Sequence, residues 1–471
     1  MIVHSIFNEL IPFLPEVSII IFALFALIFG LYRNFSKAIW WIASLWLFFL
    51  LCIIYKNPLF ITNGYVLGGL VNSGISIWLK SIVLTFTILI LLFYGGMNRV
   101  KVWSHAIHEF VIIILLATVG AMLTISARNF IILYLALELV SLSSYILAAY
   151  DRELPYSGEA GIKYLILGSL SSCIMVFGLS YIYGFSGSLM YHDVEILLLK
   201  NLYSPGLIVG ITLLVVGVLF KLSIVPFHFW TPDIYQGAPF ISVAFFTTIP
   251  KVAAIAALIN IINHVILPIQ HLWINAFIFI AILSMLVGAL GAIQQNSFKR
   301  LIGYSTILNM GFILLALSVG TTKGFASAIM YQILYSFSSL GLFATLAITI
   351  SPDAQDYKIS ILSGFGLVKK LAAFSISVFM FSLVGIPPLA GFFAKFYIIS
   401  SILNEGLYIA SILAVFITVI AAYYYINIIR IMYFSPPAEK QLRLHESSAL
   451  VFIITLCTVI VMLFPLVQYM I

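Results

Sequence analysis

Residues Gly217 to Pro239 read GVLFKLSIVPFHFWTPDIYQGAP and combine features that a simple membrane anchor does not need. Lys221 lies inside an apolar run, and Pro226 follows five residues later. A charged side chain at the centre of a membrane helix costs about 2.5–3.5 kcal/mol even on lenient insertion scales. Proline removes a backbone donor and interrupts a helix. We interpret the stretch as an interrupted, functional helix; the alternative is a kinked anchor beside a lysine that reaches toward the membrane surface.

The composition around this stretch is that of a membrane protein. Of 471 residues, 63% are hydrophobic and 8% are charged, whereas soluble domains carry about 25% charged residues. The apolar runs are long enough for membrane-spanning helices and lack the short alternating segments of a β-barrel. The sequence therefore predicts an all-α polytopic membrane protein. A net charge of +7 is expected for basic cytoplasmic loops and does not indicate nucleic-acid binding.

No cofactor or metal is expected in this chain. The three cysteines, Cys52, Cys173 and Cys457, lie far apart in apolar segments. Haem, iron–sulfur and zinc sites need closely spaced Cys or His ligands, which are missing here. No Gly-rich phosphate-binding loop lies between a strand and a helix, so a nucleotide site is not expected either.

About fourteen membrane spans can be counted, and no soluble domain interrupts them. We expect them at about 10–31, 38–55, 75–95, 106–125, 129–149, 162–185, 206–230, 241–262, 271–293, 301–319, 324–350, 371–399, 406–432 and 447–470. Residues 1–471 thus form one transmembrane domain.

The basic residues predict the orientation of these spans. One set of alternate loops carries thirteen: Arg33, Lys37, Arg99, Lys101, Arg152, Lys299, Arg300, Lys358, Lys369, Lys370, Arg430, Lys440 and Arg443. The other set carries five: Lys56, Lys80, Arg128, Lys200 and Lys323. Because Lys and Arg gather in cytoplasmic loops, both termini are expected on the non-cytoplasmic side.

Two interrupted helices suggest an internal duplication. Helix 7 breaks at Pro226, and helix 12 breaks at Pro387 and Pro388. The breaks are five spans apart, and an odd repeat length requires the second copy to be inverted in the membrane. Paired broken helices in inverted repeats mark the transport site of many carriers. We predict helices 1–3 in 1–100, a first repeat of helices 4–8 in 104–265, an inverted repeat of helices 9–13 in 268–434, and helix 14 in 445–471.

Glu138 is the acidic residue expected deepest in the membrane. It lies near the middle of helix 5, with Tyr134, Ser141 and Tyr145 on the same helix face. A carboxylate in this environment needs a partner, and a nearby ammonium group would stabilise its charge.

Four lysines complete the set of ionisable residues predicted to lie deep within spans: Lys163, Lys221, Lys251 and Lys395. A lysine held away from water gives up its proton more readily than one in water. One acid does not neutralise four lysines, so we favour a proton relay over ion pairs that only brace helices.

Three further residues are candidates with a plain structural alternative. Lys163 lies near the cytoplasmic end of helix 6, where reaching the surface is as good an explanation as function. His228 lies just past the break in helix 7 and has an ordinary structural role as its alternative. Glu109 lies near the cytoplasmic start of helix 4.

Three motifs carry a resemblance to a known family. They are FKLSIVPFHFWTPDIYQGAP from Phe220, FKRLIGYSTILNMGF from Phe298 and SLVGIPPLAGFFAKF from Ser382. Together, and in this order, they resemble the antiporter-like membrane subunits of respiratory complex I, the proton-pumping NADH:quinone oxidoreductase. These are related to subunits of multisubunit Na+/H+ antiporters. The resemblance covers nearly the whole chain. It is strongest to the subunit N branch, because the chain ends after helix 14, Lys395 replaces an acid usual in subunit M, and the opening Leu14-Pro15-Glu16 fits that branch.

The resemblance implies a function and a set of partners. Glu138, Lys221, Lys251 and Lys395 would form a proton path along the axis of the membrane arm, with Lys163 in a peripheral role. The chain would hold no redox centre, and quinone reduction would occur in other subunits of the hetero-oligomer. The expected location is the bacterial inner membrane, in contact with lipid. Two alternatives are a subunit of a multisubunit cation/proton antiporter and a structural spacer of the membrane arm.

Overall fold

The computed structural model describes residues 10–62, 64–98, 107–151, 154–201, 204–349, 358–436 and 447–468, and these are nearly all helical. The predicted all-α fold is confirmed. Several basic residues used to predict the orientation lie outside the described residues: Arg99, Lys101, Arg152, Lys440 and Arg443. The long helices of the N-terminal part are α2 (Leu14–Phe29), α3 (Arg33–Lys56), α4 (Gly74–Asn98), α5 (Ile107–Ser126), α6 (Phe130–Ala148) and α7 (Pro155–Ser186).

The middle and C-terminal parts contain shorter helices as well. They are α8 (Tyr191–Leu199), α9 (Pro205–Leu222), α10 (Trp230–Gly237), α11 (Phe240–Thr247), α12 (Ile249–Ile261), α13 (Gln270–Ile293), α14 (Phe298–Ser318), α15 (Thr322–Thr349), α16 (Phe365–Val368), α17 (Lys370–Val384), α18 (Ala390–Leu403), α19 (Tyr408–Phe434) and α20 (Ser448–Gln468). A π-helical turn, η3 (Ile262–Ile266), and a 3-10 turn, η4 (Leu267–Ile269), join α12 to α13.

Twelve stretches in the described part of the chain are long and apolar enough to cross a membrane. One of them, Phe240–Ile293, contains three helices in series, and α17 and α18 are shorter apolar helices. The chain is therefore a multi-pass membrane protein. The count of fourteen spans and the inverted repeats stay predictions.

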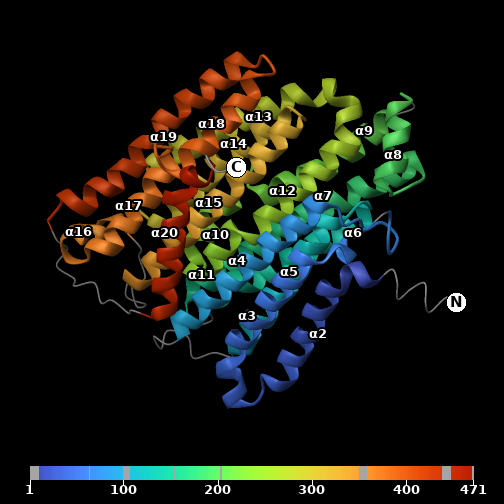
Figure 1. The fold of residues 1–471 in the computed structure, drawn as a ribbon. Helices are drawn as coiled ribbons and strands as arrows, with labels where there is room; N and C mark the ends of the chain where they lie inside the picture. Colours follow the sequence, from blue (N-terminus) through green and yellow to red (C-terminus); the bar gives the residue numbers. More distant parts are fainter. Residues whose placement is uncertain are drawn as a thin grey trace.

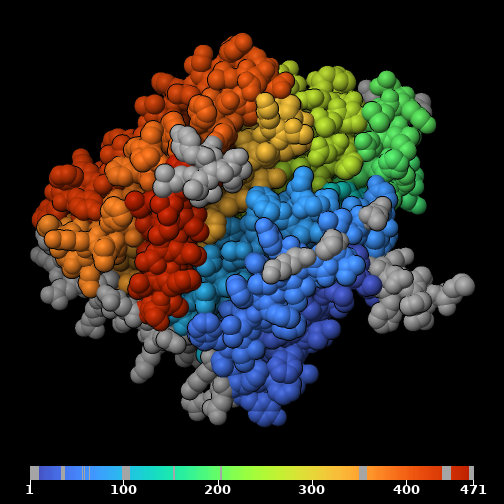
Figure 2. All heavy atoms as spheres, in the orientation of Figure 1, coloured from blue at the N-terminus to red at the C-terminus, as the bar shows by residue number. Residues whose placement is uncertain are grey.

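The helices form one elongated bundle (Figure 1). α2 and α3 lie at one end and α17 to α19 at the other, while α20 packs on both α15 and α4. In the space-filling view, α20 lies at the surface between the N-terminal and C-terminal helices (Figure 2). α14 and α15 are almost completely buried, whereas less than half of the residues in the most apolar stretches of α2, α3, α7 and α19 are buried. The centre of the bundle is thus built on α14 and α15.

Both predicted helix breaks are present, and the two are built alike. α9 ends at Leu222 and the next residue, Ser223, has φ +64°. α17 ends at Val384 and is followed by Gly385 with φ +90°. The Ile224 amide donates to the Leu219 carbonyl oxygen and the Ile386 amide to the Phe381 carbonyl oxygen, both at 3.1 Å. This bond from an amide to the carbonyl five residues earlier is the Schellman ending of a helix. Pro226 and the pair Pro387-Pro388 lie in the segments that follow, where the helix cannot continue.

Two expectations about the helices are wrong. Helix 8 was expected as one helix over 241–262, but it is divided at Thr248 into α11 and α12. Pro250 explains the division, because a proline has no backbone donor and is accepted in the first turn of a helix but not in its interior. Helix 7 and helix 12 are therefore not the only interrupted helices among the described residues. The stretch 186–205, expected as a loop, contains the short helix α8.

Candidate functional site: lysines at the helix breaks

Lys251 lies at the carbonyl end of α9. Its Nζ donates to the Lys221 carbonyl oxygen at 3.0 Å and to Ser223 Oγ at 2.7 Å. The side chain is 1% exposed and comes from the first turn of α12. The last carbonyls of a helix lack intrahelical partners and carry the negative end of the helix dipole. The ammonium group therefore satisfies the end that the break leaves open.

Other helices also support this break. Trp230 Nε1 donates to the Phe220 carbonyl oxygen at 3.0 Å, and the Val225 amide donates to Ser284 Oγ at 3.0 Å. Trp230 also places its ring 5.3 Å from Lys251 Nζ, within the range of a cation–π contact. These two hydrogen bonds tie the end of α9 and the unwound segment to neighbouring parts of the core.

Lys395 repeats this arrangement at the second break. Its Nζ donates to the carbonyl oxygens of Leu383 and Val384, both at 2.9 Å. The side chain is buried, and Nζ lies 5.3 Å from the centre of the Phe312 ring. Lys395 thus closes the carbonyl end of α17 as Lys251 closes that of α9. Two buried amines therefore sit where two interrupted helices present free carbonyls.

Glu138 and Lys221 lie nearby but have neutral partners. Lys221 Nζ donates to Tyr145 Oη at 3.3 Å, and Glu138 Oε2 accepts from Ser172 Oγ at 2.6 Å. Tyr145 and Glu138 lie two turns apart on α6, as the polar face in the sequence predicts. The ammonium partner expected for Glu138 is not among the ion pairs of the described residues. Instead Lys221 binds Tyr145 of α6, and Glu138, on the same helix, binds Ser172 of α7.

A run of serines in α15 lies between the α11–α12 division and the break after α17. Ser336 Oγ donates to the Thr247 carbonyl oxygen at 3.4 Å, and Ser339 Oγ donates to Thr247 Oγ1 at 3.1 Å. Ser338 Oγ lies 3.4 Å from Ser382 Oγ, just before the carbonyls that bind Lys395. Thr247 precedes Lys251 by four residues. The sequence reasoning missed these serines, although a polar cluster inside an apolar span is a visible signal.

A second buried chain of hydrogen bonds runs from α15 through α14 to α19. Tyr331 Oη donates to Asn309 Oδ1 at 2.7 Å, and Asn309 Nδ2 donates to Ser305 Oγ at 3.3 Å. Ser305 Oγ and Tyr425 Oη are 2.5 Å apart. The Tyr331 ring stacks on Phe312, the neighbour of Lys395. These hydroxyl groups and the amide also escaped the sequence reasoning.

Three sequence candidates lie apart from these contacts. Lys163 forms an ion pair with Glu159 at 2.6 Å on the surface of α7, and its side chain is 46% exposed. His228 is buried beside the break, and its Nδ1 has no hydrogen-bond partner within the described ranges. Glu109 lies half-buried in the first turn of α5. None of the hydrogen bonds described above brings these three to Lys251 or Lys395.

The structure contains a buried ion pair that the sequence reasoning missed, because it misplaced Lys80. Lys80 was assigned to a loop, but it lies within α4 and pairs with Glu16 of α2 at 2.5 Å. Both side chains are 3% exposed. The expectation of only five deep ionisable residues is therefore wrong. The signal was available, because Glu16 and Lys80 both lie inside predicted spans.

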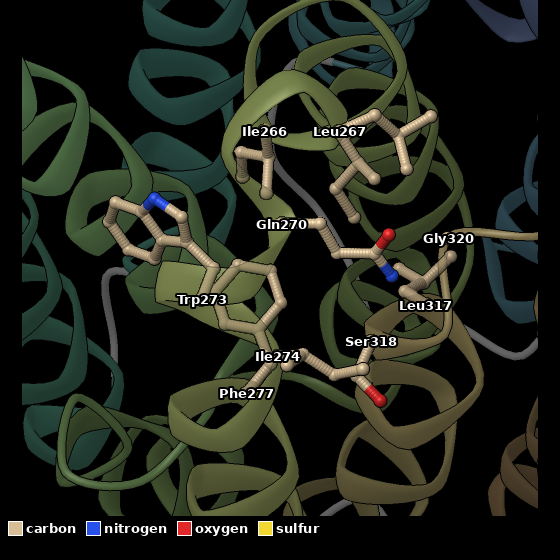
Figure 3. Close-up of a pocket in the computed structure, with 10 residues that line it drawn as sticks. Ile266, Leu267, Gln270, Trp273, Ile274, Phe277, Leu317, Ser318 and Gly320 are labelled. Atoms are coloured by element: carbon tan, nitrogen blue, oxygen red, sulfur yellow. The ribbon is translucent and has the colours of Figure 1, made fainter.

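A small, mostly apolar pocket lies elsewhere, where η3 and η4 join α13 against the end of α14 (Figure 3). Gln270 Nε2 donates to the Val319 carbonyl oxygen at 2.9 Å at its edge. None of the four lysines lines it. Its lining consists of Ile262, Ile266, Leu267, Gln270, Trp273, Ile274, Phe277, Leu317, Ser318 and Gly320.

Comparisons with known proteins identify the family. Residues 127–421 match the family described as NADH:quinone oxidoreductase/Mrp antiporter, transmembrane. The chain is 39% identical to NADH-quinone oxidoreductase subunit N of Rickettsia felis, over 90% of this chain and 93% of that protein. It superposes with a TM-score of 0.81 and 27% identity on a chain of respiratory complex I from Thermus thermophilus with bound aureothin, covering 96% and 97% of the two chains. A chain of the Mrp complex from Dietzia sp. DQ12-45-1b shares the fold, with a TM-score of 0.84 at 17% identity and coverage of 98% and 95%. The chain therefore belongs to the NADH:quinone oxidoreductase/Mrp antiporter family and, within it, to the subunit N proteins.

Proposed function

We propose that this chain is a proton-translocating membrane subunit of an NADH–quinone oxidoreductase. Its partners are other membrane subunits of that complex, and its location is the bacterial inner membrane with both termini on the non-cytoplasmic side. Electron transfer takes place in other subunits, and this chain carries protons. The relatedness to subunit N proteins and to a chain of a respiratory complex I supports the assembly.

One observation supports the proton path most directly. The amines of Lys251 and Lys395 each bind the carbonyl end of an interrupted helix in the buried core. A protonated amine is stabilised there by carbonyl oxygens and by the helix dipole, while removal from water favours its neutral form. A site in which these two effects oppose each other suits an amine that binds and releases protons.

The path follows the order of contacts. Protons enter from the cytoplasmic side near helices 7 and 8 and exchange at Lys221 and Lys251. The α15 serines connect the Thr247 region to the second break, and protons leave outward by way of Lys395. Glu138, held by Ser172, adjusts the charge balance beside Lys221. Water molecules complete the path where no side chain bridges two sites.

The test is Lys251→Ala in the assembled complex, reconstituted in proteoliposomes. We expect a large loss of proton translocation, whether or not NADH oxidation continues, because the buried amine is the exchanging group. Protons moved per NADH oxidised is the measurement. Lys200→Ala, which removes an exposed lysine at the end of α8, is the matched control and should behave like the wild type.

Two outcomes separate the alternatives. Unchanged translocation in assembled Lys251→Ala complex would reject the relay and favour a structural spacer. The second alternative, a cation/proton antiporter subunit, is favoured by the family description, which also names the Mrp antiporter, and by the fold shared with the Mrp complex. Co-purification with flavin and iron–sulfur subunits supports the oxidoreductase; their absence from a stable complex that exchanges Na+ for protons supports the antiporter.

A further inference from the structure

The Glu16–Lys80 pair lies outside the region that matches the family, and no part of the proposed path uses it. Lys80 Nζ lies 2.5 Å from Glu16 Oε1 and donates to Asn72 Oδ1 at 2.6 Å. The Asn72 oxygen also accepts from Ser126 Oγ at 2.6 Å, at the end of α5. The pair is therefore one end of a buried polar cluster that joins α2, α4 and α5.

One atom of the cluster is left without a partner. Glu16 Oε2 is buried and has no hydrogen bond to any described residue. A buried charged oxygen without a donor is costly, and a pair that served only to brace helices would use both oxygens. Glu16 Oε2 is therefore free to bind a proton or to accept a hydrogen bond from a bridging water.

The cluster is located beside the helix that carries Lys251. Asn260, near the end of α12, donates to the Ile125 carbonyl oxygen at 3.1 Å, next to Ser126. α2 and α4 begin, and α5 ends, at this side of the bundle. The cluster thus lies at the side of the molecule toward which α12 runs from Lys251.

Few other charges act on the pair. α2 and α4 contain no acidic, basic or histidine residue other than Glu16 and Lys80. His108 and Glu109 lie at the opposite end of α5, and Arg128 follows Ser126 by two residues. α3, which packs on α2 and α4, ends at Lys56 on the same side. Glu16 and Lys80 are thus the opposite charges in direct contact within this cluster.

We propose that Glu16 and Lys80 form a further proton-binding site of this chain, on the side where α2 begins. A proton moves from Nζ of Lys80 to the Glu16 carboxylate, so that one N–H bond breaks and one O–H bond forms. The pair is neutral overall before and after this step. A proton arriving from inside is taken up by the neutral amine, and the carboxylic acid releases its own proton outward. This role rests on the proposed function.

The decisive variant is the double substitution Glu16→Gln and Lys80→Met in the assembled complex. Replacing a buried ion pair by uncharged residues of similar size leaves a brace intact or strengthens it. It removes a proton site altogether. We expect normal assembly and a several-fold loss of protons moved per NADH oxidised. The exchanged pair, Glu16→Lys with Lys80→Glu, should recover part of that loss.

Wild-type translocation in the double variant overturns this site. Lys251→Ala, measured alongside, separates the two proposals, because translocation lost there but kept in the double variant leaves the main path standing. If the double variant does not assemble, Glu16→Asp decides. Its carboxylate is one methylene shorter, so the contact with Lys80 weakens and the pH profile of translocation must shift; an unchanged profile overturns the proposal.

Discussion

The ammonium groups of Lys251 and Lys395 each donate hydrogen bonds to two oxygen atoms. These side chains therefore act through hydrogen bonds as well as through charge. Substitution by alanine removes both properties together. Arginine separates them, because it keeps the positive charge and the donors but does not release its proton in proteins.

We therefore predict that Lys395→Arg assembles but fails to translocate protons. The guanidinium can still bind the Leu383 and Val384 carbonyls, so the closed end of α17 is retained. Proton translocation per NADH oxidised is the measurement, with complex assembly followed on native gels. A purely structural role for Lys395 predicts the opposite, namely translocation close to that of the wild type.

The position of Tyr145 next to Lys221 depends on a glycine of α7. A Cβ atom at Gly168 would overlap the Tyr145 hydroxyl group, which accepts the hydrogen bond from Lys221. We predict that Gly168→Ala displaces Tyr145 and lowers translocation. Gly184→Ala is the matched control on the same helix, because nothing lies within 4 Å of a Cβ there. Equal rates in the two variants would show that the Tyr145 contact is dispensable.

At the scale of the helices, three serines of α15 connect the α11–α12 division to the break after α17. Ser336 and Ser339 contact Thr247 at the end of α11, and Ser338 contacts Ser382 near the end of α17. The intervening helix is almost completely buried. Hydroxyl groups at these positions are well suited to pass protons or hold water between the lysines.

We predict that Ser338→Ala combined with Ser339→Ala slows translocation more than it reduces stability. Both changes are small and retain good helix propensity, so assembly should be close to normal. The control is Ser327→Ala in the same helix, whose hydroxyl donates to the Gly324 carbonyl oxygen, away from the breaks. Identical rates in the double variant and the control would remove α15 from the path.

At the scale of the whole molecule, charged groups divide into a buried set and a surface set. Lys163 and Glu159 belong to the surface set on α7, where solvent or lipid headgroups weaken the pair. We predict that Lys163→Ala affects translocation far less than Lys251→Ala in the same assay. A loss as large as that of Lys251→Ala would mean that the α7 surface takes part when the chain is assembled with its partners.

Much of this arrangement was predictable from the chain itself. Long apolar runs predict the helices, and Pro226 after Lys221 and Pro387-Pro388 before Lys395 predict the two breaks, because these signals are local. What the amines bind was not predictable, since Lys251 meets α9 only through tertiary packing and a serine at φ +64°. The division at Thr248 and the burial of Lys80 were misjudged although local signals existed: Pro250 lies two residues after Thr248, and Lys80 lies inside a predicted span.

The two amine-closed ends have a mechanical consequence. When Lys395 becomes neutral, the end of α17 loses its counter-charge although its carbonyl oxygens stay in place. The attraction that draws α18 toward α17 then weakens, and it returns with the next proton. On the proposed proton path, each turnover therefore changes the attraction between α17 and α18 at the break. A neighbouring subunit in contact with this helix would then respond to the charge of Lys395 without exchanging a proton with it.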